Sequence, residues 1–194
     1  MMLHRLVCYI YHTLSHRLTA RIYDDIESWS LMQYVDADLA SEPDDSRSSN
    51  GHALVLSGKH TKSTVNYGYK RQTSTAMGTP EAEVVSMAHG VKTSGLPAVS
   101  FWETVLERNV QLTIGEDNET AITIAENGYM PIMRHLGRTQ KTSVGFLGDC
   151  VADQLFQIEK VPTEEQVADI FTKSIKPHAW AHALELIGIS IING

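Results

Sequence analysis

Three strand-like stretches follow one another within residues 31–70, and predicted helices alternate with short strands after them. In 31–39, apolar and polar residues alternate, which places one kind of side chain on each face of a strand. A loop rich in turn-forming residues, 42–51, separates this segment from two further strand-like segments, 52–58 and 63–70. This order predicts an antiparallel meander at the start of the domain.

The remainder of the chain predicts helices interleaved with strands. Thr79 is a good N-cap, with Pro80 at the first helical position, and we expect this helix to end at Gly95 or Pro97. The other predicted elements are helices at about 2–16, 98–109, 119–127, 140–153 and 177–187, and strands at 111–116 and 155–161.

One more helix is predicted near the C-terminus, where Thr163 and Gln166 have the spacing of a capping box in front of Asp169. Taken together, the elements predict an α/β fold. Its core would be a mixed five-stranded sheet, an antiparallel meander extended by parallel strands, with helices on both faces. Ligands of such sheets collect at the carboxyl ends of the parallel strands.

The length and composition bound the class of protein. The 194 residues suit one globular domain, and the formal net charge of −7 argues mildly against general duplex binding, unless several acids belong to a metal site. Cys8 and Cys150 are far apart and form no CxxC pair, which argues against structural zinc and favours a reducing compartment. No apolar run reaches about 18 residues, so we expect no membrane span. The apolar start predicts a helix rather than a signal peptide, so we expect a protein that is not secreted.

Four acidic residues are the candidate chemical centre: Asp36 within a strand, Glu83 in the first turn of a helix, Asp117 at a strand end, and Asp169 in the last predicted capped helix. Four carboxylates brought together cannot all be ionised cheaply unless divalent cations neutralise them. Each residue also has a plainer interpretation. Glu83 could be a helix-stabilising first-turn acid, Asp117 an N-cap, and Asp169 an ordinary polar helix residue.

Several short motifs occur in an order that resembles the ribonuclease H domain at the end of copia-type retrotransposon Pol polyproteins. The resemblance covers roughly 30–188, and it divides the chain into an N-terminal helix and connector, 1–29, and a ribonuclease H-like domain, 30–190. The 1–29 segment resembles the linker that follows the reverse transcriptase. The motifs are YVDAD (34–38), DDSRSSNGHALVLSG (44–58), KRQ (70–72), EAE (81–83), DNETAI (117–122) and VPTEEQVADIFTK (161–173).

This resemblance implies a nuclease that cleaves the RNA strand of RNA–DNA hybrids during reverse transcription. It implies two Mg²⁺ ions, replaceable by Mn²⁺, held by Asp36, Glu83, Asp117 and Asp169. Asp36 would bridge both ions, with Glu83 and Asp117 on one side and Asp169 on the other. A reverse transcriptase domain would be the partner in the parent polyprotein, and the location would be cytoplasmic, in a virus-like particle.

Basic and polar residues near these acids are candidate substrate contacts: Lys70, Arg71, Gln72, Thr79, Arg138 and Lys141. The chain also departs from the family. Leu39 replaces the usual tryptophan, the 138–143 stretch lacks the family's histidine and acid, and 77–80 replaces a serine-rich run. A second hypothesis is therefore a decayed or repurposed domain that binds nucleic acid or a protein without cleavage. A third alternative is another nuclease or strand-transfer enzyme on the same fold. Integrases carry an Asp-Asp-Glu order, and the Asp-Glu-Asp-Asp order of this chain argues against them.

Overall fold

A computed structural model describes residues 2–41 and 44–191, so positions 42 and 43 of the predicted loop, and residue 1 of the predicted linker, lie outside the described residues. The main sheet has five strands in the order β4-β3-β2-β5-β6. Their bounds are β2 Ser30–Asp38, β3 Ser49–Ser57, β4 Lys62–Arg71, β5 Leu112–Glu116 and β6 Gln157–Lys160. The predicted α/β fold with a mixed five-stranded sheet is confirmed.

The pairing of the strands explains the mixed character of the sheet. β2, β3 and β4 form the predicted antiparallel meander, and β5 and β6 extend it in parallel from the other edge of β2. Asp36 faces Gly51 across the β2–β3 ladder, and Tyr34 faces Gly115 across β2–β5. Because β2 and β5 run in parallel, their carboxyl ends meet at one edge of the sheet, where Asp36 and Asp117 lie.

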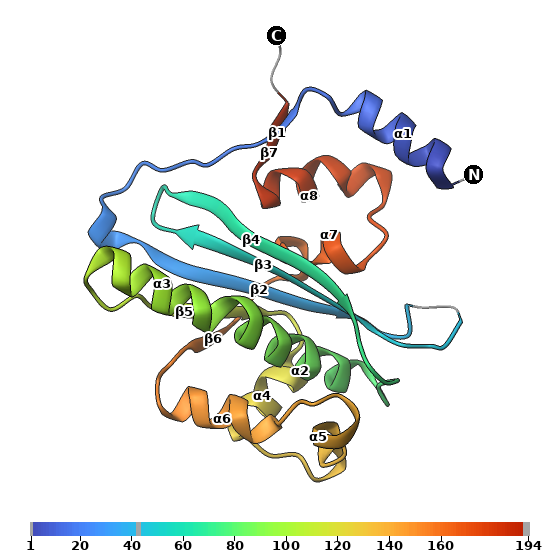
Figure 1. The fold of residues 1–194 in the computed structure, drawn as a ribbon, viewed down its shortest axis with the longest axis vertical. Coiled ribbons are helices and arrows are strands. Elements are labelled where there is room, and N and C mark those ends of the chain that lie inside the picture. Colours follow the sequence, from blue (N-terminus) through green and yellow to red (C-terminus); the bar gives the residue numbers. More distant parts are fainter. Residues whose placement is uncertain (1, 42–43, 192–194) are drawn as a thin grey trace.

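Helices cover both faces of this sheet (Figure 1). One layer packs on the apolar face of β2 and encloses the main core, which includes Leu31, Val35 and Ile114. This layer holds α2 Thr79–Gly90, α3 Leu96–Leu106, α4 Glu119–Asn127, α5 Leu136–Thr139 and α6 Val144–Ala152. The short α7 Asp169–Thr172 and α8 Trp180–Ile187 cover the opposite face, where Val167 and Ile187 form a smaller core with Ala53. β3 is buried on both faces along nearly its whole length, including the apolar run at 53–56.

The prediction that the first domain helix ends at Gly95 or Pro97 is wrong. A π-helical segment, η2 Val91–Gly95, joins α2 directly to α3, and the helical path continues to Leu106. Pro97 is the second residue of α3 and directly follows the π-helical segment, which interrupts the regular i→i−4 hydrogen bonds at this point. The start is also shifted by one residue, since Gly78 is the N-cap and Thr79 the first helical residue.

Single 3₁₀ turns connect several elements of the domain. They are η1 Ile26–Ser28, η3 Pro131–Met133, η4 Thr163–Glu165 and η5 Pro177–Ala179. The predicted helix at 2–16 is shorter than expected, because α1 Met2–His12 ends before the strand β1 His16–Leu18. β1 pairs with β7 Ile189–Ile191 and so ties the N-terminal segment to the end of the described chain.

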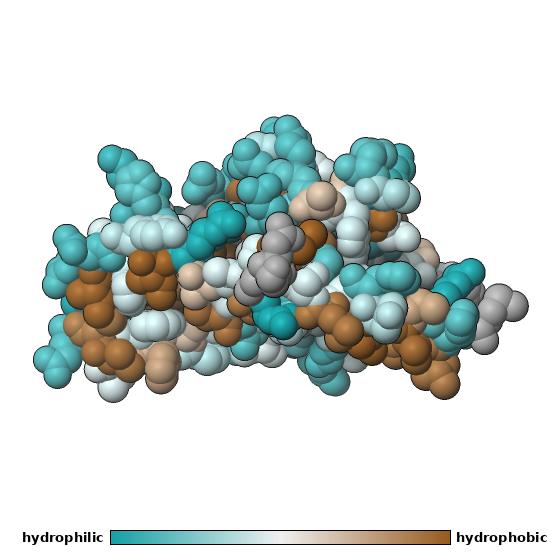
Figure 2. Space-filling model, turned by 90° about the horizontal axis from the view of Figure 1, so that it is seen from above, coloured by the Kyte–Doolittle hydropathy of each residue, from teal (hydrophilic) through white to brown (hydrophobic). Residues whose placement is uncertain are grey.

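The helix α1 projects from the domain beside α8 (Figure 1). Its apolar side chains face solvent: Leu3, Leu6, Val7 and Ile10 are each more than half exposed. Figure 2 shows hydrophobic residues at both ends of the molecule, one of which is the end where α1 lies. In the described part of the chain, none of the helices combines the length and apolar character of a membrane span. The division into a linker, 1–29, and a domain, 30–190, stays a prediction.

Candidate metal centre

Three of the four predicted acids come together at the carboxyl edge of the sheet. Asp36 on β2, Glu83 on α2 and Asp117 directly after β5 each offer a carboxylate oxygen, and these three oxygens lie within 4.8 Å of one another. Asp36 is fully buried and Glu83 is 3% exposed. Oxygen donors in this arrangement suit a hard divalent cation.

Hydrogen bonds fix α2 against the strands so that Glu83 faces this edge. The Ser86 hydroxyl donates to the main-chain carbonyl of Asp36 at 2.6 Å. Nearer the start of α2, the Gln72 amide donates to the carbonyl of Ala82 at 2.9 Å. These contacts join the first turns of α2 to β2 and to the end of β4, which limits how far the Glu83 side chain can move.

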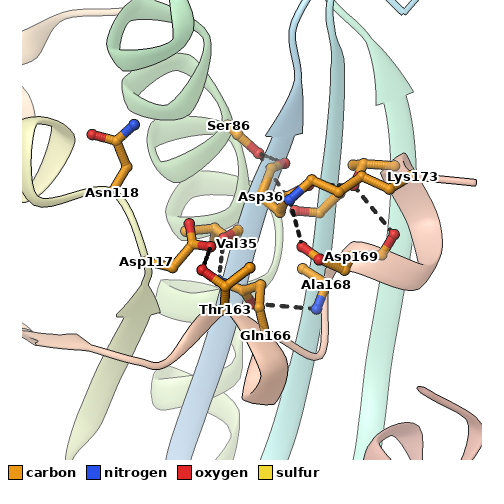
Figure 3. A network of polar contacts seen from close by, with 12 residues as sticks. Val35, Asp36, Ser86, Asp117, Asn118, Thr163, Gln166, Ala168, Asp169 and Lys173 are labelled. Atoms are coloured by element: carbon orange, nitrogen blue, oxygen red, sulfur yellow. Dashed lines mark hydrogen bonds and ion pairs between the residues drawn. The ribbon is translucent and has the colours of Figure 1, made fainter. Parts of the chain in front are cut away.

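Asp117 is free to point at its neighbours because another residue caps the following helix. Asn118 is the N-cap of α4, and its side chain accepts from the Ala121 amide at 3.0 Å. The Thr163 hydroxyl donates to Asp117 Oδ2 at 2.8 Å (Figure 3). The plainer interpretation of Asp117 as an N-cap is therefore wrong.

Asp169 reaches the same edge from the opposite face of the sheet. The buried Gln166 amide donates to the carbonyl of Val35 at 3.0 Å, which anchors the segment before α7 to β2. A Cβ at Gly51 would lie 2.6 Å from Thr172 Cγ2, so only glycine lets α7 approach β3 this closely. The predicted capping box does not form: Thr163 begins a separate 3₁₀ turn, and Gln166 is used to anchor the segment.

Asp169 is linked to Asp36 through a cation rather than directly. Lys173 Nζ lies 2.9 Å from Asp36 Oδ1 and 2.8 Å from Asp169 Oδ1 (Figure 3). The Thr172 hydroxyl donates to the other oxygen of Asp36. Sequence analysis missed Lys173 and Thr172, although both lie inside the motif 161–173 that carries Asp169.

A fifth acid at this edge was also missed. Glu116, the last residue of β5, is fully buried, and its Oε1 accepts from the Asn118 amide at 3.0 Å. Among the described residues, Glu116 Oε2 and Glu83 Oε2 are buried without a hydrogen-bond partner. The only feature of the sequence that could have indicated Glu116 as a site residue is its charge at the end of a mostly apolar strand.

Burial, together with the crowding of acids, raises three of their pKa values. Burial and the nearby charge of Glu116 raise the pKa of Glu83 to about 10. Burial and the nearby charges of Asp117 and Asp36 raise the pKa of Glu116 to about 8. Burial and Asp36 raise the pKa of Asp169 to about 6, against the opposing effect of Lys173. The site therefore favours bound positive charge, whether protons or metal ions.

The predicted substrate contacts separate into two groups. Lys70, Arg71, Gln72 and Lys141 line one pocket between the end of β4, α2 and the loop after α5, together with Lys92. Thr79 and Arg138 are exposed and do not line it.

Within the pocket, Gln72 is buried and bonded to Asn50 and Ala82, so its contacts are structural in this conformation. Arg71 pairs with Asp45. Lys70, Lys92 and Lys141 are the remaining cations of the lining.

Comparisons with known proteins match most of the chain. The chain is 26% identical to the retrovirus-related Pol polyprotein from transposon TNT 1-94 of Nicotiana tabacum over 161 residues, which are 82% of this chain. The chain spans only 11% of that relative's length. No family model matches the chain.

Among solved structures, the fold resembles LC11-RNase H1, isolated from compost by a metagenomic approach. The TM-score is 0.50 at 13% identity, over 80% of this chain and 98% of that one. The N-terminal RNase H domain of Rv2228c from Mycobacterium tuberculosis gives a TM-score of 0.49 at 12% identity, over 81% and 98% of the two chains. The fold is thus ribonuclease H-like, and the two kinds of comparison support the resemblance to the ribonuclease H domain of a copia-type Pol polyprotein.

Proposed function

We propose that this domain is a metal-dependent endonuclease that hydrolyses the RNA strand of RNA–DNA hybrids during retrotransposon reverse transcription. The observation that carries the proposal is the meeting of Asp36, Glu83 and Asp117 within 4.8 Å at the carboxyl edge of a ribonuclease H-like sheet. Similarity to a retrotransposon Pol polyprotein supports a nuclease role in that setting.

The residues present fit divalent cations. All donors are carboxylate oxygens, and Glu83 Oε2 is buried with no hydrogen-bond partner in the described residues. Asp36, Glu83 and Asp117 would hold one ion, and Asp36 with Asp169 a second. Mg²⁺ is the natural choice for such a set, with Mn²⁺ as a substitute. When bound, such ions generate the attacking hydroxide and stabilise the leaving oxygen.

The chain's own residues position this chemistry. Ser86 and Gln72 hold the first turns of α2, and Gln166 holds the segment that leads to Asp169. The scissile phosphate would lie across the acidic edge, and contacts to ribose 2′-hydroxyls would select the RNA strand. We propose that a neighbouring phosphate binds in the pocket lined by Lys70, Lys92 and Lys141.

Replacing Lys141 with alanine tests this pocket. We expect the affinity for a hybrid to fall about three- to tenfold, and the slope of log K against log salt to decrease by about 1, because one phosphate contact is lost. Fluorescence anisotropy at several salt concentrations, in Ca²⁺ to prevent cleavage, measures both quantities. Lys59→Ala, on an exposed lysine in the turn between β3 and β4 at the opposite end of the sheet, is the matched control. An unchanged salt slope in Lys141→Ala would show that Lys141 does not contact a phosphate of the hybrid.

A substrate panel tests the proposed function itself. The purified protein is incubated with a labelled RNA–DNA hybrid, duplex DNA or single-stranded RNA, each with Mg²⁺, Mn²⁺ or a chelator. We expect cleavage of the RNA strand of the hybrid alone, and none with the chelator. Tight hybrid binding without cleavage in either metal would favour the repurposed binding domain instead.

We also propose that a reverse transcriptase domain of the same polyprotein packs against the exposed apolar face of α1. Leu3, Leu6, Val7 and Ile10 offer such a surface. If the isolated domain neither binds nor cleaves the hybrid, the assay is repeated with the polymerase domain fused before α1. Recovery of cleavage in the fusion would support both proposals.

A further inference from the structure

Both carboxylate oxygens of Asp36 are engaged by residues at the end of α7. Lys173 Nζ lies 2.9 Å from Oδ1, and the Thr172 hydroxyl donates to Oδ2. The same ammonium group lies 2.8 Å from Asp169 Oδ1. A single positive charge therefore occupies the space between Asp36 and Asp169 (Figure 3).

This ammonium group stays charged and can also move. Burial alone lowers the pKa of Lys173, but the charge of Asp36 and the hydrogen bonds to both acids outweigh it, and the pKa is raised. The side chain is 36% exposed, while Asp36 is fully buried. The four-carbon stem gives the ammonium group a path to solvent, whereas the carboxylate cannot leave.

We infer that Lys173 is an internal counterion that competes with a divalent cation for the position between Asp36 and Asp169. This inference rests on the proposed two-ion function. An ammonium group and a metal ion cannot both lie at bonding distance from the same oxygens, because their charges repel. The position shared by Asp36, Glu83 and Asp117 is therefore loaded first, and the second position fills only when Lys173 withdraws.

Substrate provides a reason for Lys173 to withdraw. A backbone phosphate arriving at this edge offers the ammonium group a new anionic partner. Lys173 would then couple loading of the second ion to binding of the hybrid, and it would hold the free protein in a state with one ion. Lys173 is here a positioning residue, since it acts through the occupancy of Asp36 and Asp169.

Titration with Mn²⁺ without nucleic acid tests this inference, because electron paramagnetic resonance of free Mn²⁺ counts bound ions independently of activity. We expect the wild type to bind one ion tightly and a second weakly. In Lys173→Met, the second ion should bind about tenfold more tightly. Lys173→Arg, which keeps the charge, should behave like the wild type. Lys176→Met removes an exposed lysine three residues away and is the matched control.

A second substitution identifies where the additional ion binds. The double variant Lys173→Met with Asp169→Asn should lose the tighter second ion, and melting curves of each variant without metal verify that it is folded. If Lys173→Met binds its second ion no more tightly than the wild type, the inference is wrong while the first metal position stands. If the folded wild type and Lys173→Met bind no ion at all, the proposed metal centre fails as well.

Discussion

Replacing Asp36 with asparagine is expected to reduce cleavage of the RNA strand by about a thousandfold or more. Asparagine has nearly the same shape, but it removes the charge that contacts Lys173 and that belongs to the acidic group. Loss of a shared metal ligand removes several kcal/mol of transition-state stabilisation, and each 1.4 kcal/mol is about a factor of ten in rate. Initial rates on a labelled hybrid under single-turnover conditions measure the loss.

The matched control for Asp36→Asn lies two residues further along the same strand. Asp38 is on the same face of β2 and is half-buried, and burial and Asp36 raise its pKa. Asp38→Asn removes a similar charge without removing a member of the acidic group, so its rate should stay within about tenfold of the wild type. Parallel purification of all variants controls for host nucleases. If Asp36→Asn keeps more than a tenth of the activity, the proposed centre is wrong.

The fold was largely predictable because its signals are local. The meander is indicated by three local features: the alternation in β2, the apolar run of β3 and the turn-forming residues between them. These features can be recognised without knowing the rest of the chain. The position of Asp117 followed from the same logic, since a residue directly after a parallel strand lies at the carboxyl edge of the sheet.

The remaining parts of the site depend on contacts that no local pattern reports. Lys173 and Asp36 are 137 residues apart, and nothing in the spacing of either indicates the pair. Glu116 ends a strand, where a charged residue is usually solvated. Here it is fully buried, and it lies close enough to Glu83 for its charge to raise the pKa of that residue.

Gln166 shows how a correct local rule can lose to a tertiary contact. Its spacing from Thr163 is that of a capping box, but its side-chain amide instead donates to the buried main-chain carbonyl of Val35. The result is a very short α7, which ends where Thr172 and Lys173 must reach Asp36. The conformation of the segment around Asp169 is thus determined by its contacts at the acidic site rather than by helix propensity.

The metal-free protein is expected to lose stability as the pH rises from about 5 to about 8. Glu83 and Glu116 have an ordinary pKa of 4.5, and in the fold these values are raised to about 10 and about 8. Above pH 4.5 the unfolded chain releases protons that the folded chain keeps. The stability that these protons provide is complete below that pH and is lost towards the folded pKa values. Each of the two groups contributes at most about 1.4 kcal/mol per pH unit, so the free energy of unfolding should fall by several kcal/mol over this range.

Mg²⁺ should reverse this loss at about pH 8, because an ion replaces the protons, and it should have little effect at about pH 5, where protons compete. At a hundredfold excess over Kd, binding adds about 2.7 kcal/mol. Denaturant unfolding with and without Mg²⁺ at both pH values measures the linkage. Glu116→Gln should weaken the pH dependence of the metal-free protein, and Glu126→Gln, on an exposed α4 residue, should not. A metal-free stability that is flat or rising between the two pH values would contradict a buried, crowded acid group. A bound ion would therefore stabilise the fold where these protons are lost, in addition to serving the proposed chemistry.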